Sequence, residues 1–176
     1  MYYYGIDLSF TATGMVRLNE SGLIEETQIF QSVKGDFSYE QRIHVIAETV
    51  VQFVTPGNHP SLDRFPINVE GLAMGKRVGK ILEMGALNYH CRIQLMLHGY
   101  PYILTPPSTL KKFVIGKQPR GKGAKKELML LHTFKKWGVE FSDNNLCDAY
   151  GLARMMYEKK KMEDKSKGNI KRVKRI

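Results

Sequence analysis

The chain has 176 residues, 43% of them hydrophobic and 10% aromatic, which fits one globular domain with a full core. No apolar run approaches the roughly 18 residues of a membrane span, and the N-terminus lacks the pattern of a secretory signal. These features argue against a membrane protein and predict a cytoplasmic one. Cys91 and Cys147 are too few for a disulfide framework and lack zinc-site spacing, so we expect two reduced core thiols.

Positive charge, a formal net of +10, is concentrated in two segments. Residues 1–110 carry 8 basic and 10 acidic side chains and are close to neutral. Residues 111–126 carry seven basic and no acidic side chains, and residues 158–176 carry nine basic and three acidic ones. Neither segment has the apolar stripe of a membrane-surface helix, so the pattern favours nucleic acid as a partner over a merely solubilising surface.

The first half of the chain predicts a sheet interleaved with helices. Residues 2–18 indicate a hairpin, because two apolar runs flank the turn-rich SFTATG, and residues 26–33 indicate a third strand. Residues 38–54 have a helical apolar period, and Ser38 stands three positions before Gln41, the spacing of a capping box. The next predicted elements, in order, are a buried strand at 65–73, a long helix at 76–98 and a strand at 101–105.

The second half predicts helices followed by a charged tail. A short helix is expected at 109–116, an amphipathic helix at 124–138, and a last helix at 143–161 that Ser142 or Asp143 caps. The order of elements predicts an α/β domain, a mixed sheet flanked by helices. We expect this domain to span residues 1–157 and the basic tail, 158–176, to be disordered without a ligand.

Three acidic residues occupy positions where a carboxylate needs an explanation. Asp7 lies within a strand-like apolar run, on the face of Tyr3 and Gly5, and Glu70 ends the fourth predicted strand. Asp148 lies in the first turns of the last helix. An unpaired buried carboxylate costs several kcal/mol, so each must have a cation, hydrogen-bond donors or a metal as a partner.

Separate explanations exist for each acidic residue. Asp7 could accept hydrogen bonds from the SFTATG turn, Glu70 could pair with Lys76 or Arg77, and the helix dipole could favour Asp148. Convergence of all three, on two central strands and a helix packed above them, would instead suit Mg²⁺ or Mn²⁺, which prefer oxygen ligands. Beside a basic surface, such a site favours phosphodiester hydrolysis.

Several motifs, taken in order, resemble those of RuvC-type Holliday-junction resolvases. GIDLSFTATG is similar to the family's opening GIDPG…TG, INVEGLAMG to its second-carboxylate strand, and NNLCDAYGLA to its closing D-x-x-D-A-x-x-x-A helix. The resemblance covers about residues 1–157. GIDxS also opens other RNase H-like proteins, so the ordered set is more specific than any one motif.

The resemblance implies an RNase H-like fold with a mixed five-stranded sheet. It also implies a homodimeric hydrolase, which could be a phage-encoded member of the family. The implied activity is that of a crossover-junction endodeoxyribonuclease, which nicks two symmetric strands of a four-way DNA junction in recombination and repair. The products carry a 5′-phosphate and a 3′-hydroxyl. Alternatives are a nuclease acting on flaps, forks or RNA-containing duplexes, and a non-catalytic junction-binding protein. The implied location is the bacterial or phage-infected host cytoplasm.

The resemblance also implies roles for individual residues. Asp7, Glu70 and Asp148 would be catalytic ligands of two Mg²⁺ ions, with Mn²⁺ as a substitute. Asn145 stands at the position of a fourth ligand, Asp or His in the family, and Asp143 is the alternative. Ala73, followed by Met74, stands where the family has an aromatic near the cleaved bases, which suggests a relaxed or altered sequence preference with Met74 at the DNA. The implied DNA-binding residues are otherwise basic: Lys111, Lys112, Lys117, Arg120, Lys122, Lys125 and Lys126.

The long helix predicted at 76–98 is the expected dimer contact. Gly75, Gly79 and Gly85 would let another helix approach closely, and the family uses this region to contact its second subunit. Packing of the same glycines against the chain's own sheet is the alternative.

Overall fold

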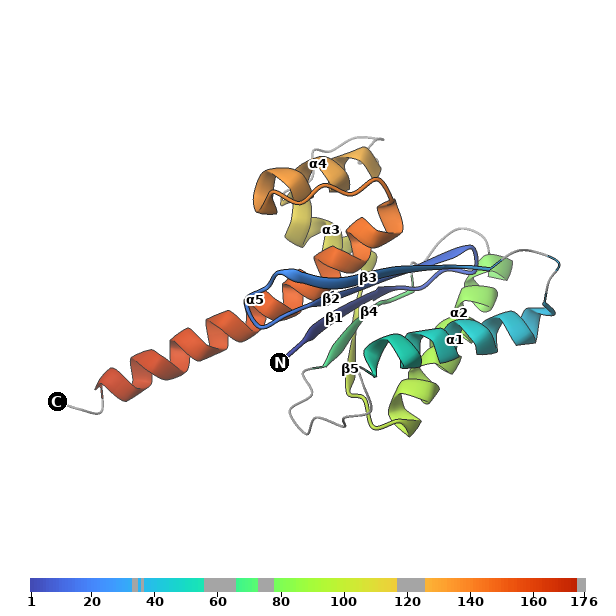
Figure 1. Ribbon diagram of the computed structural model, residues 1–176, viewed down its shortest axis with the longest axis horizontal. Helices are drawn as coiled ribbons and strands as arrows, with labels where there is room; N and C mark the ends of the chain where they lie inside the picture. The colour runs from blue at the N-terminus through green and yellow to red at the C-terminus, as the bar shows by residue number, and fades with distance from the viewer. Residues whose placement is uncertain (33–34, 36, 56–65, 73–77, 117–125, 174–176) are drawn as a thin grey trace.

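A mixed five-stranded sheet carries the fold of the computed structural model, which describes residues 1–32, 35, 37–55, 66–72, 78–116 and 126–173 (Figure 1). The strands are β1 (Tyr3–Asp7), β2 (Ala12–Leu18), β3 (Ile24–Gln31), β4 (Ile67–Glu70) and β5 (Tyr102–Thr105). Their order across the sheet is β3-β2-β1-β4-β5. The pairs β1–β2 and β2–β3 are antiparallel, whereas β1–β4 and β4–β5 are parallel. The predicted sheet is therefore confirmed.

Helices cover both faces of the sheet (Figure 1). They are α1 (Tyr39–Val54), α2 (Val78–Leu97), α3 (Pro107–Ile115), α4 (Lys126–Trp137) and α5 (Asn144–Val173). One hydrophobic core joins α1 and α2 to the sheet, and two further clusters lie under α5, α3 and α4 on the other face. Ser38 and Gln41 form the predicted capping box at the start of α1. Gly99 and Gly138 end α2 and α4 with φ 70°, a conformation that favours glycine.

The alternation of side chains along β1 decides which face Asp7 occupies. Tyr4 and Ile6 belong to the core under α1 and α2, as the sequence predicts, and Tyr3 belongs to the cluster under α5. Asp7 follows Ile6 and therefore points to the α5 face.

Two glycines allow α5 to lie directly on the backbone of the sheet. A Cβ atom on Gly5 would overlap the backbone of Ala149, and one on Gly14 would overlap the backbone of Asn145. Glycine inside a strand often marks such a close approach of another backbone. The first turns of α5 are thereby held against the end of β1 where Asp7 lies.

The sequence analysis expects a disordered tail from residue 158. In the structure, α5 instead continues as one helix to Val173. Contacts between residues four apart accompany the extension: Lys160 Nζ pairs with Asp164 Oδ1 at 2.9 Å, and Ser166 donates to the Met162 carbonyl at 3.0 Å. Such pairs stabilise a helix modestly even on a solvated surface. The predicted boundary after residue 157 thus falls inside α5.

Both cysteines are buried free thiols, as predicted. Burial raises the pKa of Cys91 to about 12 and that of Cys147 to about 11, so neither is poised to react as a thiolate. Within the described ranges, no helix combines the length and the apolar character needed to cross a membrane.

Candidate active site

Two carboxylates meet where β1 and β4 end. These strands are parallel, with Gly5 opposite Asn68 and Ile6 opposite Val69, so the next positions, Asp7 and Glu70, lie side by side. Asp7 is 7% exposed, and its side chain is hydrogen-bonded to that of Glu70. Of the arrangements that the sequence left open, the structure shows the one in which two paired strands bring Asp7 and Glu70 together.

Burial, and then the charge of Glu70, raise the pKa of the Asp7 carboxyl well above its ordinary value. Smaller contributions come from Asp148 and Asp143. Burial also raises the pKa of Glu70, but the hydrogen bond from Asp7 and the charge of Lys111 oppose this shift. The two carboxyl groups therefore resist being ionised together, and a bound proton or a cation would relieve their repulsion.

The first turns of α5 bring Asp148 and Asn145 to this pair. Asn145 lies against Gly14, which is the residue opposite Asp7 on β2. Asp148 is half-buried and close enough for its charge to raise the pKa of Asp7. The structure thus places both residues beside the strand that carries Asp7, as the sequence predicts, while their catalytic roles stay predictions.

Asp143 caps α5. Its Oδ1 atom accepts hydrogen bonds from the backbone N–H groups of Asn145 at 2.7 Å and Leu146 at 3.0 Å. These are donors that the first turn of a helix leaves unsatisfied. One oxygen of Asp143 is therefore already used, although its charge also reaches Asp7.

Lys111 lies at the edge of the carboxylate site. It belongs to α3, which begins directly after β5, and its half-buried ammonium group lowers the pKa of Glu70. The neighbouring Lys112 is exposed. Nine residues that the sequence singled out lie outside the described residues: Ala73, Met74, Gly75, Lys76, Arg77, Lys117, Arg120, Lys122 and Lys125. Lys126 is the first residue of α4, and its side chain is likewise outside the described part.

The donor set fits a hard divalent cation in its chemistry. Asp7, Glu70 and Asp148 offer oxygen ligands, and the raised pKa values of Asp7 and Glu70 mark a place where a cation would relieve the repulsion between carboxylates. As these side chains are oriented, however, no three Asp, Glu, His or Cys residues of the described part form a ready-made metal site. Ligation by Asp148 would therefore require its side chain or its neighbours to adjust.

Polar residues that the sequence analysis missed hold the site together. Thr105 donates to Asn68 Oδ1 at 2.7 Å, and Asn68 Nδ2 donates to the Leu152 carbonyl at 3.0 Å, which ties β5, β4 and α5 together. Asn88 of α2 donates to the Glu70 carbonyl at 3.1 Å. The alternation of Ile67, Asn68, Val69 and Glu70 would have indicated that Asn68 shares the face of Glu70.

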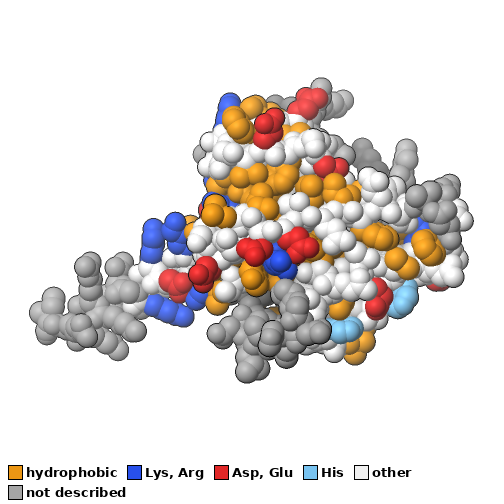
Figure 2. Space-filling model, viewed as in Figure 1, with side chains coloured by type: hydrophobic (Ala, Val, Ile, Leu, Met, Phe, Trp, Pro, Cys, Tyr) orange, Lys and Arg blue, Asp and Glu red, His pale blue; other side chains and the backbone are white. Residues whose placement is uncertain are grey.

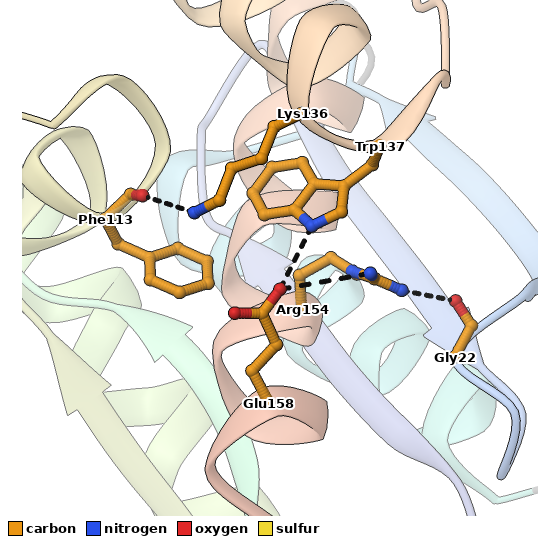
Figure 3. Close-up of polar contacts among 6 residues, drawn as sticks. All are labelled: Gly22, Phe113, Lys136, Trp137, Arg154 and Glu158. Carbon is orange, nitrogen blue, oxygen red and sulfur yellow. Dashed lines mark hydrogen bonds and ion pairs between the residues drawn. The ribbon is translucent and has the colours of Figure 1, made fainter. Parts of the chain in front are cut away.

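A second polar network fastens α3 and α4 to α5 (Figure 3). Lys136 Nζ donates to the Phe113 carbonyl at 2.9 Å and lies over the Phe113 and Trp137 rings. Trp137 donates to Glu158 at 3.0 Å, and Arg154 donates to the Gly22 carbonyl at 2.9 Å. The two helices that flank the basic segment, and with them Lys111, are therefore anchored to the helix that carries Asp148.

Solved structures of junction-cleaving proteins resemble this chain. RuvC of T. thermophilus in complex with a Holliday junction substrate has a TM-score of 0.68 at 15% identity, covering 90% of this chain and 95% of that chain. Another Thermus thermophilus RuvC structure gives 0.68 at 16% identity, covering 90% and 96%. Fowlpox virus resolvase with its substrate Holliday junction DNA gives 0.51 at 12% identity, covering 90% and 98%. No family model and no curated protein sequence matches the chain. The chain therefore has the RuvC-type, RNase H-like fold that its motifs resemble.

Proposed function

We propose that this protein is a Holliday-junction resolvase, a metal-dependent endonuclease that nicks two symmetric strands of a four-way DNA junction. The observation that carries the proposal is the pair of buried Asp7 and half-buried Glu70, with Asp148 beside it, at the strand ends of this fold. The solved structures with this fold include two proteins bound to Holliday junction DNA. The expected products are a 5′-phosphate and a 3′-hydroxyl, and the expected location, which follows from this substrate, is the bacterial or phage-infected cytoplasm.

Mg²⁺ or Mn²⁺ held by Asp7, Glu70 and Asp148, with Asn145 or Asp143 as a fourth ligand, would activate water and stabilise the leaving 3′-oxygen. A carboxyl group must be ionised to act as a ligand, and the raised pKa of Asp7 opposes its ionisation. Lys111, beside Glu70, provides positive charge for the non-bridging oxygens of the scissile phosphate. The close packing of α5 on Gly5 and Gly14 fixes Asp148 relative to Asp7.

Symmetric nicking requires two active sites, and we assign the dimer contact to α2. Its exposed side carries large apolar side chains at helical spacing: Leu82, Tyr89, Ile93 and Met96. Among the described residues, a Cβ atom on Gly79 would meet nothing within 4 Å, so packing against them does not explain this glycine. Gly85 approaches the Leu72 side chain instead, at 4.0 Å. Gly75 lies outside the described residues.

The test is cleavage of an end-labelled four-way junction with Mg²⁺ and with EDTA, by the native protein and by Asp7→Asn. Paired symmetric nicks should appear only when the metal ion is present. Asp7→Asn should lower the cleavage rate at least about a hundredfold while junction binding persists. Glu140→Gln, which removes an exposed carboxylate that is not among the proposed ligands, is the matched control and should cut normally. Equal cleavage of flaps and forks would instead indicate a broader branched-DNA nuclease.

One observation favours a non-catalytic junction-binding protein as the second candidate. Asn145 brings no charge to the position of the fourth ligand, and the described carboxylates form no ready-made metal site. A junction that is bound but remains uncut with both Mg²⁺ and Mn²⁺ would support this candidate.

A further inference from the structure

The distal half of α5 projects beyond the sheet. The helix runs antiparallel to β1, because Asn145 lies over Gly14, Ala149 and Ala153 over Gly5, and Tyr157 against Tyr3 with ring centroids 5.5 Å apart. Residues after Tyr157 therefore extend past the start of β1, away from Asp7, and the helix leaves the body of the molecule there (Figure 1).

This projecting segment is strongly basic and exposed. Lys159, Lys161, Lys165 and Lys167 are all exposed. Among the ion pairs of the described residues, one involves residues 159–167, between Lys160 and Asp164. Figure 2 shows Lys and Arg side chains on both edges of the projecting helix, with acidic side chains between them.

We propose that residues 159–167 of α5 bind the phosphate backbone of a duplex arm of the junction, away from the cleaved strands. The inference rests on the proposed function and names a part of the substrate that the carboxylate site does not touch. Lysine ammonium groups bind phosphates as point charges without reading sequence. The helix is already formed, so binding does not have to overcome the ordering entropy of a disordered tail.

The distribution of the lysines favours a duplex over a membrane surface. Lys159 and Lys167 line a hollow beside Ile103 and Phe113, whereas Lys161 and Lys165 line another beside Tyr3. Charge therefore lies on opposite sides of the helix, while a membrane-bound helix needs one face free of charge.

The spacing along α5 predicts where the contact falls. At about 1.5 Å per residue, Lys159 lies about 17 Å and Lys167 about 28 Å along the helix from Asp148. Measured along a duplex at about 3.4 Å per base pair, these distances correspond to about 5 to 8 base pairs from the cleaved phosphate. Arms shorter than this should escape the contact.

The test measures binding of the full chain, in EDTA so that no strand is cut, by fluorescence anisotropy at several salt concentrations. One junction has arms of about 20 base pairs and the other has arms of about 4 base pairs closed by hairpin loops. The variant K161Q/K165Q/K167Q removes three charges, and K161R/K165R/K167R is the matched control that keeps them.

On long arms, the glutamine variant should bind about tenfold more weakly, and the slope of log affinity against log salt should fall by about 2 to 3. The arginine variant should retain the native slope, and all three proteins should converge on short arms. An equal loss on both junctions, or no loss on long arms, overturns the inference while the proposed function stands. A native protein that neither prefers nor cuts junctions overturns the proposed function, and the inference with it.

Discussion

Asp7 and Glu70 share a hydrogen bond between their carboxyl groups, at the ends of the neighbouring parallel strands β1 and β4. Burial, and then the charge of Glu70, raise the pKa of Asp7. At neutral pH, this pair therefore destabilises the folded chain unless a proton or a cation neutralises it.

Asp7→Asn should raise the thermal stability of the metal-free protein at neutral pH. In the unfolded chain the pKa of Asp7 is about 3.9, and in the folded chain its pKa is higher. Protonated Asp7 therefore stabilises the folded state. This stabilisation is complete when the pH is below the pKa that Asp7 has in the unfolded chain, and it is lost as the pH rises through the pKa that Asp7 has in the folded chain. Asparagine has no such proton to lose, so its melting temperature should exceed the native one at about pH 7.5, by about 3 °C per kcal/mol.

Melting curves in EDTA across this pH range provide the measurement. The difference between Asp7→Asn and the native protein should vanish as pH falls toward about 4. Glu140→Gln removes an exposed carboxylate and should show no such trend. A lower melting temperature for Asp7→Asn at neutral pH would show that the pair is not strained.

Divalent cations should stabilise the native protein and not the ligand variants. A cation that binds the folded state alone adds about 2.7 kcal/mol at a hundred times its dissociation constant. We therefore expect Mn²⁺ or Mg²⁺ to raise the native melting temperature and EDTA to reverse the rise. Glu70→Gln and Asp148→Asn should lose most of this response, and calorimetric titration with Mn²⁺ should show the same loss. A full response in both variants would place the cation elsewhere.

Asn145 rather than Asp143 should be the fourth ligand, because the cap at the start of α5 occupies one Asp143 oxygen. Asn145→Ala should raise the Mg²⁺ concentration for half-maximal cleavage several-fold, and Asn145→Asp should lower it. Asp143→Asn keeps a good cap and should change little. Cleavage rates over a Mg²⁺ series decide the matter, and a larger shift for Asp143→Asn than for Asn145→Ala would reverse the assignment.

Local patterns in the sequence predict much of the fold and of the site. Two-residue alternation along β1 assigned Asp7 to the face opposite Ile6, and the spacing of Ser38 and Gln41 predicted the start of α1. Both depend on neighbours within a few residues, where periodicity and capping chemistry act.

Features set by distant packing could not be predicted in the same way. The sequence analysis offered Lys76 or Arg77 as partners of Glu70, and both lie outside the described residues. It did not predict the effect of Lys111 on Glu70, because only the β5–α3 connection brings Lys111 near the end of β4. The continuation of α5 through a charged, aperiodic segment was also not predicted. Packing on the sheet fixes the first part of α5, and the helix continues from there into a segment that has no apolar pattern of its own.

Gly5→Ala should destabilise the fold and separate Asp148 from Asp7. The new Cβ would overlap backbone atoms of Ala149, which cannot move without displacing α5. Overpacking of this kind costs about 3 kcal/mol or more when backbone must shift. Urea denaturation measures the loss. At Gly71, the matched control for alanine substitution, the nearest atom to a new Cβ is the Thr105 carbonyl oxygen at 3.4 Å, so Gly71→Ala should cost far less. Equal midpoints for the two variants would contradict the close approach of α5.

A charge placed on the exposed apolar side of α2 should dissociate the proposed dimer. Ile93 and Met96 are 45% and 61% exposed, and burying a glutamate against a second copy would desolvate its charge. Ile93→Glu and Met96→Glu should each raise the dimer dissociation constant at least about tenfold, which is about 1.4 kcal/mol. Leu131→Glu, at an exposed apolar site on α4, is the matched control. Light scattering with size-exclusion chromatography reports the mass. Monomers that still nick both strands together would show that α2 does not form the active assembly.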